Sequence, residues 1–290
     1  MKNQNVDSAK QTKIQTRRIG IIAGRGNLPI ALARSLRADG ETPFLLLIEG
    51  EADPDHYLDF PHKVIRIAKI GQFLKTLAAE KCTHITLAGP VNRPDFKKLV
   101  PDFEGIKLLA KISGALSKGD DGLMTAITTF IKDKGFDIIG AHEITGSMSI
   151  GKEQLGNSSP SEQDRQDIKE GIRIVKAIGE LDIGQAAIIR DGYVLAVEAA
   201  EGTDGLLQRA NSFSWSKPAG VLVKLSKPGQ DLQADMPTIG PETVTEAINA
   251  NLRGIAVEAG LTLVLDKTEV TRRADEGGIF IVGVSDSFTP

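Results

Sequence analysis

Short apolar runs alternate with helical segments along the first half of the chain, and this alternation constrains the fold more than any other feature. An unbroken apolar run of four or five residues is typical of a strand buried on both faces. Strands that alternate with helices form a parallel sheet covered on both sides. We therefore predict an α/β domain with a mostly parallel, Rossmann-like sheet over residues 19–145. The expected strands are Ile19–Ala23, Phe44–Ile48, Val64–Ala68, Ile85–Ala88 and Phe136–Gly140, and the expected helices begin near Pro29, Phe73, Asp102 and Leu123.

The second half of the chain predicts another α/β domain, over residues 167–290. A polar stretch rich in glycine and serine, 146–166, is expected to link the two domains. Arg190-Asp191-Gly192 lies between two apolar runs and predicts a β-hairpin. Residues 1–18 are polar and predict a flexible tail. The other expected elements are a helix at Ile168–Ile178, strands at Gly220–Lys224, Gly254–Val257, Thr262–Leu265 and Gly278–Val282, and helices from Thr203, Pro241 and Lys267.

Composition excludes several classes of protein. The net charge is −3 and only 4% of residues are aromatic, whereas a nucleic-acid binder usually has a basic surplus and aromatic stacking platforms. No apolar run approaches the roughly 18–20 residues that span a bilayer. The tail lacks the apolar core of a secretory signal. Cys82 is the one cysteine, which rules out an intramolecular disulfide framework and fits a reducing compartment. We therefore expect a cytoplasmic protein that binds no nucleic acid.

A glycine-rich turn follows the first expected strand. Gly24-Arg25-Gly26-Asn27 would let backbone N–H groups approach an anion, and the helix that follows adds its positive end. A dinucleotide fingerprint needs a third glycine where this chain has Pro29. The turn therefore favours contact with a phosphate or sugar over a full dinucleotide site, and a tight turn without any ligand is the alternative.

Three further polar segments are candidates for a site. Asp120 and Asp121 either cap a helix or help position a hydroxylated ligand or a metal. The segment Glu198–Gly205 directly follows a strand, where α/β sites usually form; helix capping by Thr203 or Asp204 would not explain Glu198. The segment Lys224–Pro241 contains lysines suited to phosphate and aspartates suited to Mg²⁺, or is a solvated surface loop. The four histidines have no metal-ligand spacing, and Cys82 is expected in the core.

Motifs along nearly the whole chain carry a family resemblance. The sequence resembles the UDP-2,3-diacylglucosamine pyrophosphatase family of lipid A biosynthesis, the type found mainly in alphaproteobacteria. Each motif alone is modest, but together and in this order they are specific. They are Ile21-Ile22-Ala23-Gly24-x-Gly26-x-Leu28-Pro29, Gly89-x-Val91-x-Arg93-Pro94-Asp95-Phe96, Lys118-Gly119-Asp120-Asp121, Gly140-Ala141-His142-Glu143, Leu181-Asp182-Ile183-Gly184-Gln185, Val197-Glu198-Ala199-x-Glu201-Gly202-Thr203-Asp204, Lys224-x-x-Lys227-Pro228-x-Gln230 and Asp235-x-Pro237-Thr238-Ile239-Gly240.

The resemblance implies two α/β domains with the substrate held between them. It implies Mg²⁺-dependent hydrolysis of UDP-2,3-diacylglucosamine to UMP and 2,3-diacylglucosamine 1-phosphate (lipid X), with water attacking the α-phosphorus. The family's catalytic aspartate falls on Asp235, which we expect to bind Mg²⁺ or to orient the water. Arg25 departs from the family pattern, because many members have glycine there.

The resemblance also suggests roles for other residues. Lys224 and Lys227 are expected to contact phosphate, and Glu201 and Asp204 are reserve metal ligands. The remaining expected substrate contacts are Gly24, Gly26, Asn27, Ala88, Gly89, Asp120, Asp121, Gln185, Glu198, Gly202, Thr203 and Gln230.

The implied partner is a lipid-linked nucleotide sugar, met through transient contact with the inner face of the inner membrane. A homo-oligomer is compatible with the sequence. Two other functions stay open at this point. One is a nucleotide-dependent oxidoreductase, against which Pro29 counts. The other is a non-enzymatic protein that binds a nucleotide sugar or lipid and needs no metal.

Overall fold

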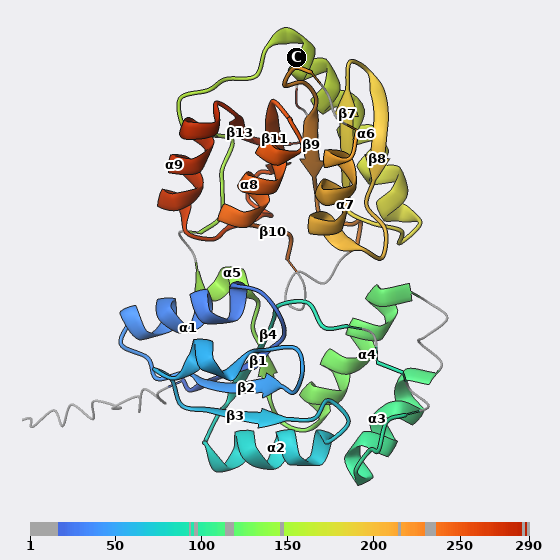
Figure 1. The fold of residues 1–290 in the computed structure, drawn as a ribbon. Coiled ribbons are helices and arrows are strands. Elements are labelled where there is room, and N and C mark those ends of the chain that lie inside the picture. Colours follow the sequence, from blue (N-terminus) through green and yellow to red (C-terminus); the bar gives the residue numbers. More distant parts are fainter. Residues whose placement is uncertain are drawn as a thin grey trace, which may run out of the picture.

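The computed structural model describes residues 17–92, 94–95, 98–113, 119–145, 148–213, 216–229, 236–285 and 288, with the backbone alone at 119–121. The described chain forms two α/β domains, one above the other in Figure 1. Most of the tail expected at 1–18, and the residues Gln230 and Asp235, lie outside the described residues.

The N-terminal domain contains a five-stranded parallel sheet in the order β3-β2-β1-β4-β5. This is the strand order of a Rossmann-like sheet, so the prediction from the alternating pattern is confirmed. Every residue of β2 is buried, as its unbroken apolar sequence predicts. The strands are β1 (Ile19–Ala23), β2 (Phe44–Ile48), β3 (His62–Ile65), β4 (His84–Ala88) and β5 (Asp137–Ile138).

Helices cover both faces of this sheet. Helices α1 and α5 share one apolar cluster with it, and α2 and α4 contribute to the cluster on the other face. Helix α3 packs on α2 and α4 and lies at the outer corner of the domain (Figure 1). The helices are α1 (Leu28–Ala38), the short 3₁₀ helix η1 (Pro54–Tyr57), α2 (Ile70–Ala79), α3 (Phe103–Ser113), α4 (Gly119–Asp133) and α5 (Ala141–Ile144).

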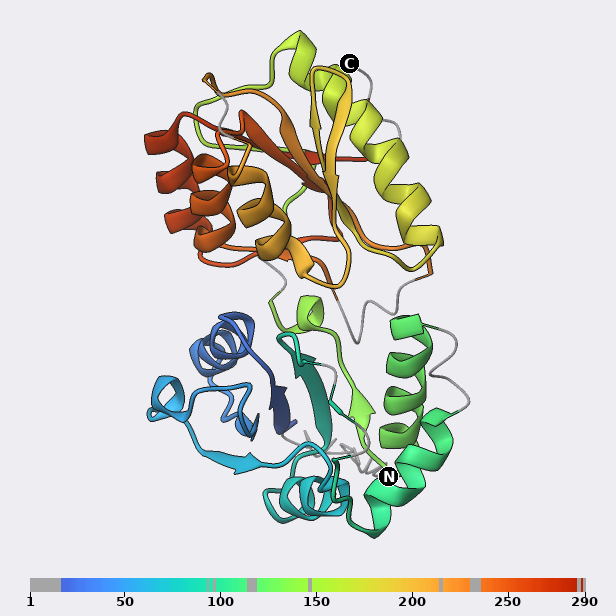
Figure 2. The same cartoon turned by 45° about the vertical axis from the view of Figure 1, so that its right-hand side comes forward.

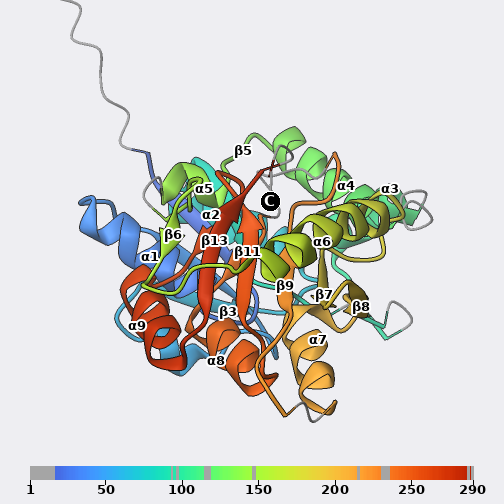
Figure 3. The same cartoon turned by 90° about the horizontal axis from the view of Figure 1, so that it is seen from above.

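The C-terminal domain contains a six-stranded mixed sheet in the order β6-β13-β11-β9-β7-β8. Strands β9, β11 and β13 are mutually parallel, whereas β7 runs antiparallel to both β8 and β9. Helix α6 covers one face, and α7, α8 and α9 cover the other (Figure 3). The elements are β6 (Gln154–Leu155), α6 (Glu162–Glu180), β7 (Ala186–Arg190), β8 (Tyr193–Val197), α7 (Gly202–Asn211), β9 (Val221–Lys224), α8 (Pro241–Asn249), β11 (Gly254–Glu258), α9 (Lys267–Gly277) and β13 (Phe280–Val284).

Several boundaries differ from those the sequence predicts. The sequence predicts aspartates capping a helix from Leu123, but α4 begins at Gly119, so Asp120 and Asp121 lie inside its first turn. The segment 146–166, which the sequence suggests as a linker, contains β6, which pairs with β13, and the first residues of α6. Strand β6 has only two residues and the first turn of α6 is polar, so neither shows an apolar period in the sequence.

The two domains contact each other beside a two-stranded parallel ladder of β10 (Thr238–Ile239) and β12 (Leu263–Val264). Met236 and Leu263 belong to the same buried cluster as the residues of β1, α1 and α5. Helix α5 lies at the top of the N-terminal domain, facing the C-terminal domain (Figures 1 and 2). None of the helices among the described residues combines the length and the hydropathy that a membrane span requires.

Candidate active site

The glycine turns after β1 and β4 meet at the carboxyl edge of the N-terminal sheet. Strand order reverses between these two strands, and open α/β sheets bind ligands at such a switch point. The N–H of Gly24 donates to the Ala88 carbonyl at 2.8 Å, and the N–H of Arg25 donates to the Pro90 carbonyl at 2.9 Å. The structure thus brings together Gly24, Ala88 and Gly89, three of the expected substrate contacts.

The close approach of these turns explains the glycines. A Cβ on Gly24 would lie 2.5 Å from the Pro90 carbonyl oxygen. A Cβ on Gly89 would lie 2.2 Å from the Arg25 carbonyl oxygen, and Gly89 has φ +83°. Gly26 has φ +80° but open space around its Cβ position. Both turns therefore need glycine for backbone reasons, whether or not a ligand binds.

Gly89→Ala is expected to destabilise the protein by about 2–4 kcal/mol, because it combines a positive φ with a backbone clash. Gly26→Ala is the matched control, since φ is nearly the same and nothing lies within 4 Å of the new Cβ. Its expected cost is about 1 kcal/mol. Urea denaturation of both variants measures the difference. Equal free energies of unfolding would show that the Gly89 turn relaxes freely.

The β1–α1 turn also contacts the other domain. Asn27 Nδ2 donates to Glu242 Oε2 at 3.3 Å, and Glu242 lies in the first turn of α8. The Asn27 side chain makes no capping hydrogen bond to α1. Arg25, which departs from the family pattern, pairs with Glu51 at 3.0 Å. The turn is therefore held on one side by its own domain and on the other by α8.

Three of the expected residues in the C-terminal domain form one hydrogen-bonded group, Glu198, Thr203 and Lys224. Lys224 Nζ donates to Thr203 Oγ1 at 2.8 Å, and Thr203 Oγ1 donates to Glu198 Oε2 at 2.8 Å. Lys224 Nζ also donates to the Thr238 carbonyl at 3.0 Å. Glu198 and Lys224 are each only 6% exposed. Burial strengthens such interactions, so this group fixes the carboxyl ends of β8 and β9 relative to Thr238.

The segment that follows β9 is anchored on two sides. Glu258, at the end of β11, accepts hydrogen bonds from the Ser226 N–H at 2.8 Å and from the Ser226 hydroxyl. Lys227 Nζ pairs with Asp182 Oδ1 at 2.5 Å, and both side chains are largely buried. Lys227 thus lies on the same edge of the sheet as Lys224 but bonds to a different element. The anchors hold the start of the segment that leads to Asp235.

The reserve metal ligands lie at the exposed start of α7. Glu201 pairs with Arg209 at 2.5 Å, and Asp204 is exposed in the same turn. A hydrogen bond from the Glu201 backbone N–H, together with Arg209, lowers the pKa of the Glu201 carboxyl. Across the described residues, no three His, Cys, Asp or Glu side chains cluster closely enough to hold a metal. The oxygen atoms at this edge that could bind a metal belong to carboxylates and carbonyls, the ligands that suit Mg²⁺.

The structure describes the remaining expected substrate contacts in different detail. Gly202 begins α7 with φ +73°, and the Gln185 carbonyl accepts from the Leu225 N–H at 3.0 Å. The Gln185 Oε1 atom is buried without a hydrogen-bond partner in the described structure. Helix α4 precedes a parallel strand, so its first turn, with Asp120 and Asp121, begins at the carboxyl edge and faces the C-terminal domain (Figures 1 and 2).

Sequence reasoning missed Thr238, Glu258, Asp182 and Glu242. Thr238 acts through a carbonyl, which no residue type reveals. Glu258 could have been found, because it follows an expected strand in the same position as Glu198. Asp182 lies within a family motif and Glu242 lies outside every motif, and the partners of both are far away in sequence.

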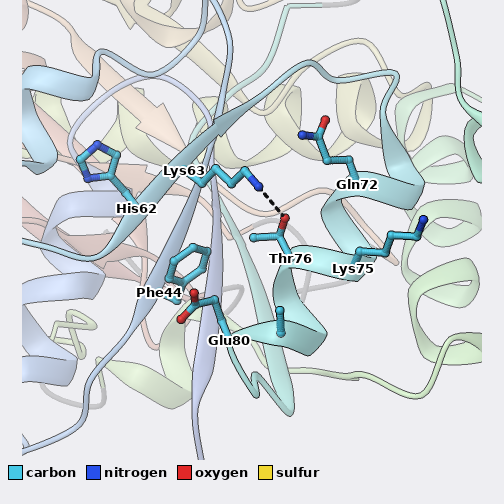
Figure 4. A pocket seen from close by; sticks show the side chains of 8 residues that line it. Phe44, His62, Lys63, Gln72, Lys75, Thr76 and Glu80 are labelled. Carbon is cyan, nitrogen blue, oxygen red and sulfur yellow. Dashed lines mark hydrogen bonds between the residues drawn. The ribbon is translucent and has the colours of Figure 1, made fainter.

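Two other features lie outside the candidate site. Burial raises the pKa of the Cys82 thiol to about 11, with Arg18 opposing and Glu80 assisting, so the thiol stays protonated as a core residue. A hollow beside β3 and α2 is lined by Lys63, Lys75 and other polar residues (Figure 4). It includes Phe44 and His62, the first residues of β2 and β3, so it lies at the opposite edge of the sheet from Gly24 and Gly89.

Comparison with known proteins gives consistent matches along the chain. Residues 18–148 match the family model of the LpxI N-terminal domain, and residues 151–282 match that of the LpxI C-terminal domain. The UDP-2,3-diacylglucosamine pyrophosphatase LpxI of Caulobacter vibrioides is 40% identical over 281 residues, which cover 94% of this chain and 100% of that protein.

Similarity to solved structures is low. UDP-N-acetylglucosamine 4-epimerase from Bacillus cereus has a TM-score of 0.25 and 14% identity, covering 41% of this chain and 32% of that chain. The Bordetella bronchiseptica enzyme WbmG with NAD and UDP has a TM-score of 0.32 and 12% identity, covering 94% and 82%. Neither likeness supports an inference about function.

Proposed function

Because the chain belongs to the LpxI family, we propose that it is a UDP-2,3-diacylglucosamine pyrophosphatase that acts in lipid A synthesis. The observation that carries the proposal is the meeting of the two domains. The Gly24 and Gly89 turns lie at the switch point of the N-terminal sheet. The turn that contains Gly24 also contacts α8, and α8 directly follows the Asp235–Gly240 motif. The site thus joins a glycine-lined edge to a buried lysine group and to the motif of the expected catalytic aspartate.

The finer chemistry that we propose is Mg²⁺-dependent cleavage to UMP and 2,3-diacylglucosamine 1-phosphate. The glycine turns of the N-terminal domain would contact the nucleotide or its phosphates through backbone N–H groups. The pyrophosphate is doubly anionic and repels hydroxide, so the site must neutralise its charge. Among the described residues, Lys224 Nζ donates to two acceptors, Thr203 Oγ1 and the Thr238 carbonyl, which leaves one of its three N–H donors for a phosphate oxygen.

We propose Mg²⁺ as the cofactor, with Asp235 as its carboxylate ligand or as the group that orients water. Proteins often hold Mg²⁺ with one or two carboxylates, substrate phosphates and water, so no three-residue cage is needed. When bound, Mg²⁺ would neutralise phosphate charge and lower the pKa of a water molecule. Asp204 is the better reserve ligand, because Glu201 is occupied by Arg209.

Hydrolysis of UDP-2,3-diacylglucosamine in ¹⁸O water, with Mg²⁺ and with excess EDTA, tests this proposal. We expect UMP and the sugar phosphate with Mg²⁺, a loss of about 10²-fold or more with EDTA, and recovery when Mg²⁺ is added back. Tight binding without products would instead favour a non-enzymatic binding protein. Attack at the α-phosphorus puts the label in UMP; label in the sugar phosphate would contradict that expectation and move the attack to the β-phosphorus.

A lipid substrate implies contact with the membrane that holds it. We propose that the protein works in the cytoplasm and meets the inner face of the inner membrane transiently.

A further inference from the structure

Helix α3 and the residues just before it expose three large apolar side chains. Val100, just before the helix, is 71% exposed, Phe103 is 71% exposed and Ile106 is 56% exposed. Residues three and seven positions apart share one side of a helix, so Phe103, Ile106 and the exposed Ala110 form a row. We call Val100, Phe103, Ile106 and Ala110 the α3 face.

The opposite side of α3 accounts for its attachment to the domain. Leu108 and Ile112 are buried in a cluster with Phe130 of α4, and Leu74 of α2 packs against it. Asp102 fixes the start of the helix by accepting from the N–H groups of Gly105 at 2.8 Å and Gln72 at 3.2 Å. Burial of Asp102 opposes ionisation, but these bonds outweigh it and lower its pKa. The α3 face is therefore displayed on a firmly held helix.

Lysines lie on α3 and beside it. Lys107 Nζ lies 4.3 Å from the centre of the Phe103 ring, and the side chain of Lys98 is 85% exposed. Exposed ion pairs contribute little, so these ammonium groups can exchange their partners for lipid phosphates at small cost. Among the described residues, each of four lysines on or beside α3 pairs with a carboxylate, and Glu104 pairs with two of them. The pairs are Lys98–Asp95, Lys107–Glu104, Lys111–Asp133 and Lys134–Glu104.

Apolar side chains beside lysines on one helix face are the pattern of a helix that lies in a membrane interface. Scattered exposed apolar residues are ordinary and need no explanation, as at Leu58 elsewhere on the surface. The α3 face differs because Phe103, Ile106 and Ala110 form a row along a helix at the outer corner of the domain, with Val100 just before it (Figure 1).

We propose that the α3 face docks on the surface of an anionic phospholipid membrane. The apolar side chains would enter the boundary between headgroups and acyl chains, and the lysines would contact lipid phosphates. The proposal rests on the proposed function in one respect, because a two-chain lipid substrate gives the protein a reason to visit a membrane.

Vesicle flotation with the full-length protein tests the docking without substrate. We expect binding to vesicles of phosphatidylglycerol and phosphatidylethanolamine, weaker binding to phosphatidylcholine alone, and release at high salt. A triple variant, Val100→Ser, Phe103→Ser and Ile106→Ser, should bind at least about tenfold more weakly. Leu58→Ser with Tyr193→Ser is the matched control and should bind like the wild type, since these residues are equally exposed but lie elsewhere.

Equal binding by the triple variant, or no binding by the wild type, would overturn the proposal. Sedimentation of the proteins without vesicles tests whether a second copy of the chain covers the α3 face instead. A dimer that the triple substitution abolishes would make the α3 face a self-association surface and overturn membrane docking. Circular dichroism confirms that the variant is folded.

Activity separates this proposal from the proposed function. The triple variant should hydrolyse substrate in detergent micelles at the wild-type rate but lose about tenfold on vesicle-borne substrate. Asp235→Ala should dock on vesicles normally but hydrolyse neither the micellar nor the vesicle-borne substrate. Equal loss of the triple variant in both assays would count against a docking role, whereas vesicle binding by a protein without pyrophosphatase activity would leave docking intact and refute the proposed function.

Discussion

Asp235→Ala is expected to lower kcat by about 10³-fold or more while the protein stays folded. The pyrophosphate presents negative charge to any attacking water, so a group that binds Mg²⁺ or orients that water is needed for turnover. Asp235 lies one residue before Met236, which packs in the buried cluster shared with the N-terminal domain. The adjoining Thr238 carbonyl accepts from Lys224. The chain on one side of Asp235 is therefore fixed at the domain boundary.

Three measurements make this prediction specific. Asp231→Ala removes a carboxylate from the same segment, and we expect it to keep most of the activity. Thermal denaturation should give a similar midpoint for both variants and the wild type. Substrate binding to Asp235→Ala, measured by calorimetry, should persist because the phosphate contacts remain. Turnover by Asp235→Ala close to the wild-type rate would show that the catalytic carboxylate lies elsewhere.

The sequence predicts the architecture well where apolar runs are continuous. Ile19–Ala23 and Phe44–Ile48 are strands with the expected bounds, because strands of this kind are set by their own residues. The two-residue strands β6 and β10 could not be predicted. Each consists of too few residues to show a period, and each is formed only by its pairing with β13 or β12. Tertiary context decides such elements.

The candidate site shows the same division between local and long-range information. Gly24 and Gly89 could be named from the sequence, because each follows an expected strand, and parallel strands end at a common edge. The pairing of Glu201 with Arg209, which occupies an expected metal ligand, spans eight positions, about two turns of α7, and the residue types alone do not reveal it. The link from Lys224 to the Thr238 carbonyl spans fourteen positions and depends on how β9 and β10 are placed.

Lys224→Met should lower kcat/KM by about 10²-fold and destabilise the protein by about 2–3 kcal/mol. Methionine keeps most of the aliphatic stem but donates no hydrogen bond. The Thr238 carbonyl then loses a donor, and Glu198, only 6% exposed, loses the nearby positive charge that Thr203 connects to it. Urea denaturation and steady-state kinetics on micellar substrate measure the two effects separately.

A second substitution tests whether Lys224 acts on the substrate or only on the fold. Thr203→Val breaks the link between Lys224 and Glu198 but leaves both charges and the Thr238 contact in place. Its cost in stability should be about 1–2 kcal/mol, with less than about tenfold loss of kcat/KM. If Lys224 contacts a phosphate, Lys224→Met therefore loses far more activity than Thr203→Val for each unit of lost stability. If the two variants lose activity in proportion to stability, Lys224 is a structural lysine, and the phosphate charge must be met by Lys227 or by the metal.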